Sequence, residues 1–237
     1  MRPTQLTLAV AALLTCSHTA VAQGLADYAT PRPVPPGRSI VVGFLGGFDR
    51  WDDPHRGVRK VVLDLRSRGL YADSASNHRY RTALKFLRQA LDTNRNGRID
   101  PPEAAAARIV LFGQSWGGAT AIKVARALER QGVPVLLTVQ VDSVGLDDAV
   151  IPSNVRSAAN FYQHDFLTIQ GQREIRAADP SRTRILGNVQ FSYPAAPARG
   201  SDASWLRRTV GRSHVSMELD PRVWSTVEKL ILDAAAH

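Results

Sequence analysis

The stretch LFGQSWGGAT (111–120) decides how this chain folds, because it sets one serine among glycines where an apolar run ends. Ser115 is the centre of a Gly-x-Ser-x-Gly motif. Residues 108–113 predict a buried strand, and residues 117–132 carry apolar side chains at helical spacing. A sharp turn from strand to helix holds a serine hydroxyl out as a nucleophile, close to the N–H groups of the helix N-terminus. The simpler interpretation is a tight turn without chemistry.

The rest of the chain alternates between segments of strand character and segments of helical character. We expect strands at 38–45, 70–76, 108–113, 133–142, 157–163 and 184–193, and helices at 57–69, 78–92, 117–132 and 220–236. Strands that alternate with helices are typical of a parallel sheet covered on both faces. The sequence therefore predicts an α/β fold in a single domain, with a mostly parallel sheet and helices on both faces.

The N-terminal residues have the pattern of a secretory signal peptide. Arg2 supplies a positive charge, residues 6–15 are apolar, and Ala20-Val21-Ala22 fits a cleavage site. We expect a signal peptide at 1–22, a Pro-rich lead-in at 23–37 and the folded domain at 38–237. This organisation predicts a secreted or periplasmic protein. A buried N-terminal helix, or a lipid anchor at Cys16, are the alternatives.

Composition excludes several classes of partner. The net charge is +9, but the arginines are scattered and no dense basic run with interleaved aromatic residues occurs. We therefore expect no nucleic-acid partner. No second long apolar run follows the N-terminal one, so no transmembrane segment is expected. Cys16 is the only cysteine, so the mature chain would have no disulfide and a bound metal would be useful.

A nucleophilic serine needs a base, and the base needs a carboxylate that orients it. His214 lies in GRSHVSMELDP (211–221), which we expect to be a polar loop between the last strand and the closing helix. This position fits the chain order serine, acid, histidine. Asp142 ends the strand after the serine-bearing helix and is the preferred acid. Asp165, which follows the next strand, is the alternative.

A tetrahedral oxyanion needs at least two hydrogen-bond donors. The N–H of Trp116, directly after the nucleophile, is the first candidate. The second should come from GFLGGFD (43–49), where two adjacent glycines keep the backbone open. The N–H of Phe44 is preferred and that of Leu45 is the alternative. A plain Gly-rich turn would explain the same residues without a catalytic role.

These motifs together resemble the α/β-hydrolases of the lipase and esterase type, over residues 38 to 236. The resemblance rests on VVGFLGGFD (41–49), LFGQSWGG (111–118), VQVDSVG (139–145) and SHVSMELDP (213–221). It implies hydrolysis of esters or thioesters through an acyl-enzyme. Pancreatic-type lipases and some thioesterases place the acid where this chain has Asp142. Lipases usually have His-Gly where this chain has Val42-Gly43.

A second motif, DTNRNGRIDPPE (92–103), fits the calcium-binding loop of an EF-hand. Gly97 stands where the loop turns sharply, and Ile99 is the aliphatic anchor. Hard oxygen ligands at this spacing favour calcium. The expected ligands are Asp92, Asn94, Asn96, the carbonyl of Arg98, Asp100 and Glu103. No second loop pairs with this one, so a structural ion is expected; an ordinary polar loop is the alternative.

The leading functional prediction is a secreted serine hydrolase of carboxylic esters, acting on a small-molecule or lipid ester. An acyltransferase with the same triad and a catalytically inactive, calcium-stabilised binding module are the alternatives. Near His214, an apolar pair and three arginines could meet an acyl chain and an anionic head group, or could belong to a solvated loop: Trp205, Leu206, Arg207, Arg208 and Arg212. Oligomeric state and substrate are left open.

Overall fold

A computed structural model describes residues 23–164, 170–193 and 212–236. Its strands are β1 (Ile40–Leu45), β2 (Tyr71–Ser76), β3 (Ile109–Gln114), β4 (Val135–Val141), β5 (Val150–Ile151), β6 (Val155–Gln163), β7 (Arg176–Ala177) and β8 (Arg184–Phe191). Its helices are η1 (Leu25–Asp27), α1 (Gly57–Ser67), η2 (Asn77–Arg79), α2 (Tyr80–Leu91), α3 (Pro101–Ala105), α4 (Trp116–Glu129), α6 (Arg212–Leu219) and α7 (Pro221–Ala236).

The α/β fold is confirmed. Six strands form one sheet in the order β2-β1-β3-β4-β6-β8, and every neighbouring pair is parallel. The chain moves from β1 outward to β2 and then returns to place β3 on the other side of β1. This reversal creates a topological switch point between β1 and β3, where the carboxyl ends of open parallel sheets bind ligands.

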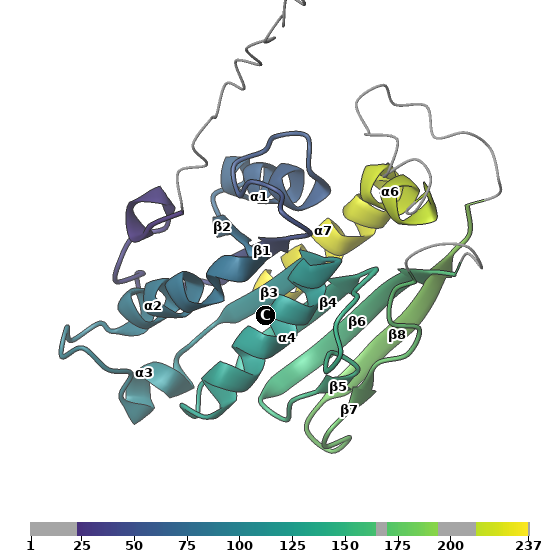
Figure 1. Cartoon of the computed structure of the whole chain (residues 1–237). Coiled ribbons are helices and arrows are strands. Elements are labelled where there is room, and N and C mark those ends of the chain that lie inside the picture. Colours follow the sequence, from purple (N-terminus) through teal and green to yellow (C-terminus); the bar gives the residue numbers. More distant parts are fainter. Residues whose placement is uncertain (1–22, 165–169, 194–211, 237) are drawn as a thin grey trace, which may run out of the picture.

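Helices cover both faces of the sheet, and alternate residues of each strand face alternate layers. Val42 and Phe44 of β1 face the core under α2 and α4, whereas Val41 and Leu45 face the core under α1 and α7. Figure 1 shows α4 lying across one face of the sheet and α7 behind it. Burial on both faces explains why the central strands β1, β3 and β4 are nearly continuous apolar runs. None of the described helices is long and apolar enough to cross a membrane.

The predicted lead-in packs onto the domain. Tyr28 is buried and stacks on Phe86 of α2, with 4.2 Å between ring centroids. The side chain of Gln23 donates to the Ser74 carbonyl at 2.8 Å and accepts from the Ser76 N–H at 3.1 Å. This segment begins with the short helix η1 and continues without a regular helix or strand. It packs against β2 and α2 because Gln23 bonds to the backbone of β2 and Tyr28 has an apolar site at Phe86.

Several described elements were not predicted: η1, η2, α3, β5, β7 and α6. Helix α3 is a single turn after the EF-hand-like segment, and β5 and β7 pair in a small separate sheet. The expected loop around His214 is wrong, since residues 212–219 form helix α6. Glu218 of α6 accepts a hydrogen bond from the Gly57 N–H at 2.9 Å. Tertiary contact of this kind favours a helix that sequence periodicity alone does not reveal.

Candidate active site

Ser115 sits in a strained turn between β3 and α4. Its backbone has φ 56° and ψ −127°, a conformation that a non-glycine residue rarely adopts. The Ser115 N–H donates to the Val141 carbonyl at 2.9 Å, which ties the turn to the end of β4. The side chain is 7 % exposed. The surrounding structure therefore holds the serine in a high-energy backbone geometry at the carboxyl edge of the sheet.

The glycines around Ser115 are required by close backbone packing. A side chain at Gly113 would collide with the Gly117 backbone, and one at Gly117 would collide with the carbonyl of Phe44. Both glycines therefore let the first turn of α4 approach β1 and β3 closely. A side chain at Gly118 would collide with Ser143, which follows β4, so this glycine is also required by close packing.

Asp142 lies at the end of β4, one strand away from Ser115. It is fully buried and has φ 46°, which turns its carboxylate away from the strand direction. Oδ1 accepts from the Gln163 N–H at 3.3 Å, and Oδ2 accepts from the Gln163 Nε2 at 3.1 Å. A side chain at Gly171 would collide with this carboxylate. Asp142 is thus held in one orientation by neighbours on two sides.

The structure brings His214 to Asp142. The Nδ1–H of His214 donates to the Asp142 Oδ2 at 2.6 Å. Helix α6, which carries His214, is held by buried Met217 and by the Trp224 Nε1–H, which donates to the Glu218 carbonyl at 2.7 Å. A short hydrogen bond from a histidine to a buried carboxylate fixes the ring orientation and leaves the other nitrogen as a proton acceptor.

That other nitrogen faces Gln114, the residue directly before Ser115. The His214 Nε2 lies 3.0 Å from the Gln114 Nε2. Sequence reasoning missed Gln114, although its place as the last residue of β3 puts it next to the nucleophile. Among the described residues, Ser115, Asp142, Gln114 and His214 therefore share one edge of the sheet.

The predicted donor at Phe44 is not supported by its position. Phe44 lies inside β1, opposite Ala75 of β2 and Gly113 of β3. A backbone N–H inside a central strand is used in the ladder of the sheet, so that of Phe44 is unsuited to bind an oxyanion. Gly43 lies inside the same strand, and a side chain there would collide with the Phe112 ring.

The backbone that approaches the nucleophile belongs to Gly46. A Cβ built on Gly46 would lie 3.0 Å from the Ser115 Cβ. Leu45, the alternative donor, is the last residue of β1 and lies opposite Ser76. Trp116 is the first residue of α4, where N–H groups have no partner within the helix. The strand ends at Leu45, as expected, and the backbone nearest to Ser115 is the one directly after it, at Gly46.

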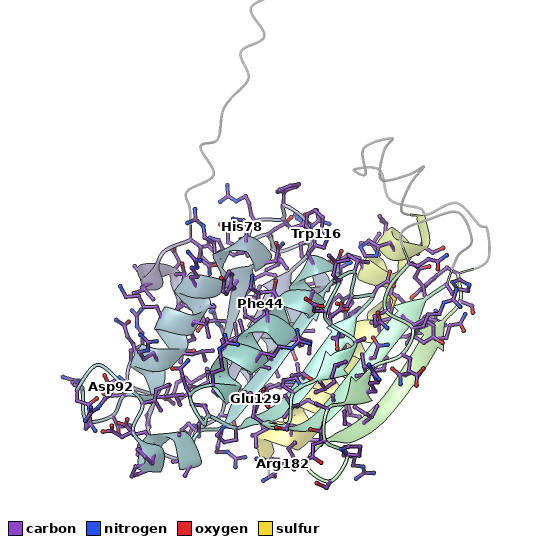
Figure 2. All side chains as sticks on the ribbon, turned by 60° about the horizontal axis from the view of Figure 1, so that its bottom comes forward. Phe44, His78, Asp92, Trp116, Glu129 and Arg182 are labelled. Carbon is purple, nitrogen blue, oxygen red and sulfur yellow. The ribbon has the colours of Figure 1, made fainter. Side chains whose placement is uncertain are left out.

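An exposed aromatic pair borders Ser115. Phe48 is 89 % exposed and Trp116 is 46 % exposed, and their rings meet edge to face with 5.7 Å between centroids. Figure 2 shows Trp116 at one end of the molecule and Arg182 at the opposite end, which places this pair at the carboxyl edge of the sheet. Large aromatic side chains left in water are suited to contact an apolar ligand.

The other candidate residues lie away from this edge of the sheet or outside the described residues. His55 is exposed beside Asp53, and His164 is exposed beside Arg173 at 2.9 Å. Asp165, the alternative acid, lies outside the described residues. The same holds for His237 and for four of the residues expected near the substrate: Trp205, Leu206, Arg207 and Arg208. The side chain of Arg212 is not described.

The acidic side chains of the EF-hand-like loop accept hydrogen bonds from the backbone of the same loop. Asp92 accepts from the Asn96 N–H at 3.0 Å and the Gly97 N–H at 2.8 Å. Glu103 accepts from the Thr93 N–H at 2.7 Å and the Asp100 N–H at 2.9 Å. Hydrogen bonds from the Asp100 N–H and the Thr93 hydroxyl lower the pKa of Glu103 to about 2.

The remaining predicted ligands surround Asp100. Its Oδ2 accepts from the side-chain amides of Asn94 at 2.9 Å and Asn96 at 2.6 Å. Its Oδ1 pairs with the Arg98 guanidinium at 3.0 Å. No three acidic, histidine or cysteine side chains of the described residues gather closely enough to hold a metal ion. The oxygen set fits calcium by chemistry, but Glu103 would have to exchange its hydrogen bonds for the ion.

Comparisons with known proteins add one fold similarity. No protein-family model matches the chain, and no curated protein matches it in sequence. One similar solved structure is titled "A novel cutinase-like protein from Cryptococcus sp."; the TM-score is 0.43 and the sequence identity 12%, over 87% of this chain and 98% of that chain. A likeness of this size says nothing of what the chain binds or cleaves, so its chemistry depends on its own residues.

Proposed function

We propose that the protein is a serine hydrolase that cleaves carboxylic esters through an acyl-enzyme on Ser115. The observation that carries the proposal is the 2.6 Å hydrogen bond from His214 to buried Asp142, at the sheet edge where Ser115 occupies a strained turn. A nucleophile, a base and an orienting acid drawn from three separate segments form the set that acyl transfer needs. The α/β-hydrolase resemblance of the sequence points to the same chemistry.

The reaction begins when the Ser115 Oγ attacks the ester carbonyl and its proton passes to the His214 Nε2. The tetrahedral oxyanion is stabilised by the Trp116 N–H and by a backbone N–H of the Gly46-Gly47 turn. Collapse breaks the ester bond, and the imidazolium returns the proton to the departing alcohol. Water then attacks the acyl-enzyme with His214 again as base, which releases the acid and restores Ser115.

The exposed aromatic pair supports a substrate with an apolar part. Phe48 and Trp116 would contact the acyl or alcohol group of a small-molecule or lipid ester. An acyltransferase would use the same residues, with an alcohol or amine replacing water in the second half-reaction. We also propose a secreted or periplasmic location, because residues 1–22 have the pattern of a signal peptide.

Labelling with a fluorophosphonate, which reacts with activated serines, tests the proposed function. We expect covalent labelling of the wild-type protein and none of Ser115→Ala or His214→Ala. Ser76→Ala is the matched control, since Ser76 is also buried at the carboxyl end of a strand. It should label like wild type. A folded wild-type protein that does not react would contradict the hydrolase and favour the inactive binding module.

We further propose a structural calcium ion in the loop 92–103. The ligands would be Asp92, Asn94, Asn96, the Arg98 carbonyl, Asp100 and Glu103. Positive φ at Arg95 (60°) and Gly97 (86°) turns the loop on itself, which supports the proposal. Figure 2 places Asp92 far from Trp116, so the ion would stabilise the connection between α2 and β3 without entering the reaction.

Thermal unfolding with and without calcium tests this ion. For a Kd of about 10⁻⁴ to 10⁻³ M, ~10 mM Ca²⁺ would stabilise the protein by about 1.4–2.7 kcal/mol relative to excess chelator. This corresponds to a rise in Tm of about 3–10 °C for a chain of this size. Asp92→Asn should reduce the rise. An equal Tm in Ca²⁺ and in chelator would mean that the hydrogen bonds of the loop suffice without an ion.

A further inference from the structure

Gln114 occupies a position between the candidate base and the loop after β1. It is the last residue of β3, is 5 % exposed, and has its Nε2 3.0 Å from the His214 Nε2. On the other side, a Cβ on Gly46 would collide with the Gln114 Oε1. The amide is therefore enclosed between His214 and the backbone of Gly46, which has room for it only because Gly46 has no side chain.

The direction of the contact with His214 follows from the other ring nitrogen. Nδ1 must carry hydrogen, because it donates to the Asp142 carboxylate at 2.6 Å. In the neutral ring Nε2 is then an acceptor. The Gln114 amide must therefore present its NH₂ group to His214, with its oxygen toward Gly46. The lone pair that Gln114 occupies is the one that would accept the Ser115 proton.

We propose that Gln114 is a positioning residue that stabilises neutral His214, with Nε2 as acceptor, and releases Nε2 to the Ser115 hydroxyl when substrate binds. The proposal rests on the proposed function, because it assigns His214 the role of base. A donor on Nε2 favours the neutral ring over the imidazolium. Gln114 would thus keep the base ready at lower pH than His214 alone would allow.

Other charged and titratable groups lie near His214 and are the same residues in wild type and in every variant of the test. Asp142 faces Nδ1, and Glu218 lies one turn further along α6. Glu218 in turn interacts with Asp49 and Arg56. The Tyr193 hydroxyl donates to Asp220 at 2.9 Å. Burial raises the pKa of Glu218 to about 7, so it ionises in the same pH range, but it does so in wild type and variants alike. A difference between the His214 midpoints of wild type and variant therefore reports the lost amide.

The experiment follows the His214 ring by NMR and kcat/KM against pH in wild type, Gln114→Met and Gln114→Glu. Methionine keeps the length but removes the donor, so the midpoint of the ring titration and the acid limb of activity should rise by about 0.7 pH unit. Glutamate places a carboxylate on Nε2 and should raise both by about 1–2 units. Gln131→Met is the matched control, since Gln131 donates to the Ala127 carbonyl in another part of the fold.

The two readouts separate this proposal from the proposed function. The NMR titration needs no activity, so an upward shift in Gln114→Met supports the positioning role even if no ester is cleaved. Equal midpoints in wild type, Gln114→Met and Gln114→Glu, with the fold intact by circular dichroism, would overturn it. A loss of activity at all pH values without a shift would mean that Gln114 only packs against Gly46, and this outcome also contradicts the proposal.

Discussion

Asp142→Asn is expected to lower kcat by about 10⁴-fold while the protein stays folded, since an amide in place of the orienting carboxylate leaves the base in the wrong tautomer. The carboxylate now accepts from the His214 Nδ1–H and from the Gln163 backbone N–H. An asparagine of nearly the same shape has one acceptor and one donor group. The outcome depends on which group faces the histidine.

The Gln163 backbone settles that orientation. A backbone N–H cannot become an acceptor, so the asparagine oxygen must take the place of Oδ1. The NH₂ group then takes the place of Oδ2 and faces the His214 Nδ1, which becomes the acceptor, and the ring hydrogen moves to Nε2. The Gln163 side-chain amide, which donates to Oδ2 at 3.1 Å in the wild type, must turn its oxygen toward this NH₂ group. A ring protonated at Nε2 cannot take the Ser115 proton.

The measurement is kcat on a chromogenic ester, with thermal unfolding to verify the fold. Asp73→Asn is the matched control, because Asp73 is also fully buried and accepts from backbone N–H groups, those of Ala29 and Thr30. It should lose stability without the 10⁴-fold loss of rate. A folded Asp142→Asn protein within about tenfold of wild-type kcat would remove Asp142 from the triad and return Asp165 as the acid.

The positions of Ser115 and Asp142 at one edge of the sheet follow from the sequence, because both residues directly follow buried strands. Parallel strands bring their carboxyl ends to one edge, so two residues in these positions must become neighbours once the strand order is right. The hydrogen bond from the Ser115 N–H to the Val141 carbonyl shows that the ends of β3 and β4 lie side by side. Continuous apolar runs, which indicate buried strands, were enough to predict that the two residues are neighbours.

The sequence predicts the other residues less well because tertiary contacts decide them. His214 was placed in the right segment, but α6 forms through contacts of Glu218 and Met217 with residues distant in sequence. The sequence favours the N–H of Phe44, with that of Leu45 as the alternative, but the backbone approaches Ser115 at Gly46, a position set by its contacts with Gln114 and Ser115. The orientation of the Gln114 amide depends on His214 and Gly46 together, so no local pattern could indicate it.

The second large effect concerns Glu218, which is buried on the helix that carries His214. Burial raises the pKa of Glu218 to about 7, although the Gly57 N–H and Arg56 oppose the rise. Its Oε2 has no hydrogen-bond partner among the described residues. The ionised form is therefore poorly accommodated in the fold.

The sign of the pH dependence follows from proton binding. Between pH 4.5, the ordinary value for a glutamate, and about 7, the folded state binds more protons at Glu218 than the unfolded state does. Protonated Glu218 therefore contributes to the free energy of unfolding in full below about pH 4.5, and this contribution is lost as the pH rises through about 7. The rise in the pKa of Glu218 corresponds to a loss of roughly 3 kcal/mol in the free energy of unfolding over this pH range.

Glu218→Gln should abolish this loss, because glutamine keeps an oxygen for the Gly57 N–H and cannot ionise. We expect the free energy of unfolding of the variant, relative to wild type, to increase by about 3 kcal/mol from pH 4.5 to pH 8. Denaturant unfolding at several pH values measures it, and exposed Glu174→Gln is the control. The difference between two pH values cancels any constant cost of the amide. A difference that stays flat over this range would mean that Glu218 ionises without penalty, and that α6 and His214 are held equally well at both ends of it.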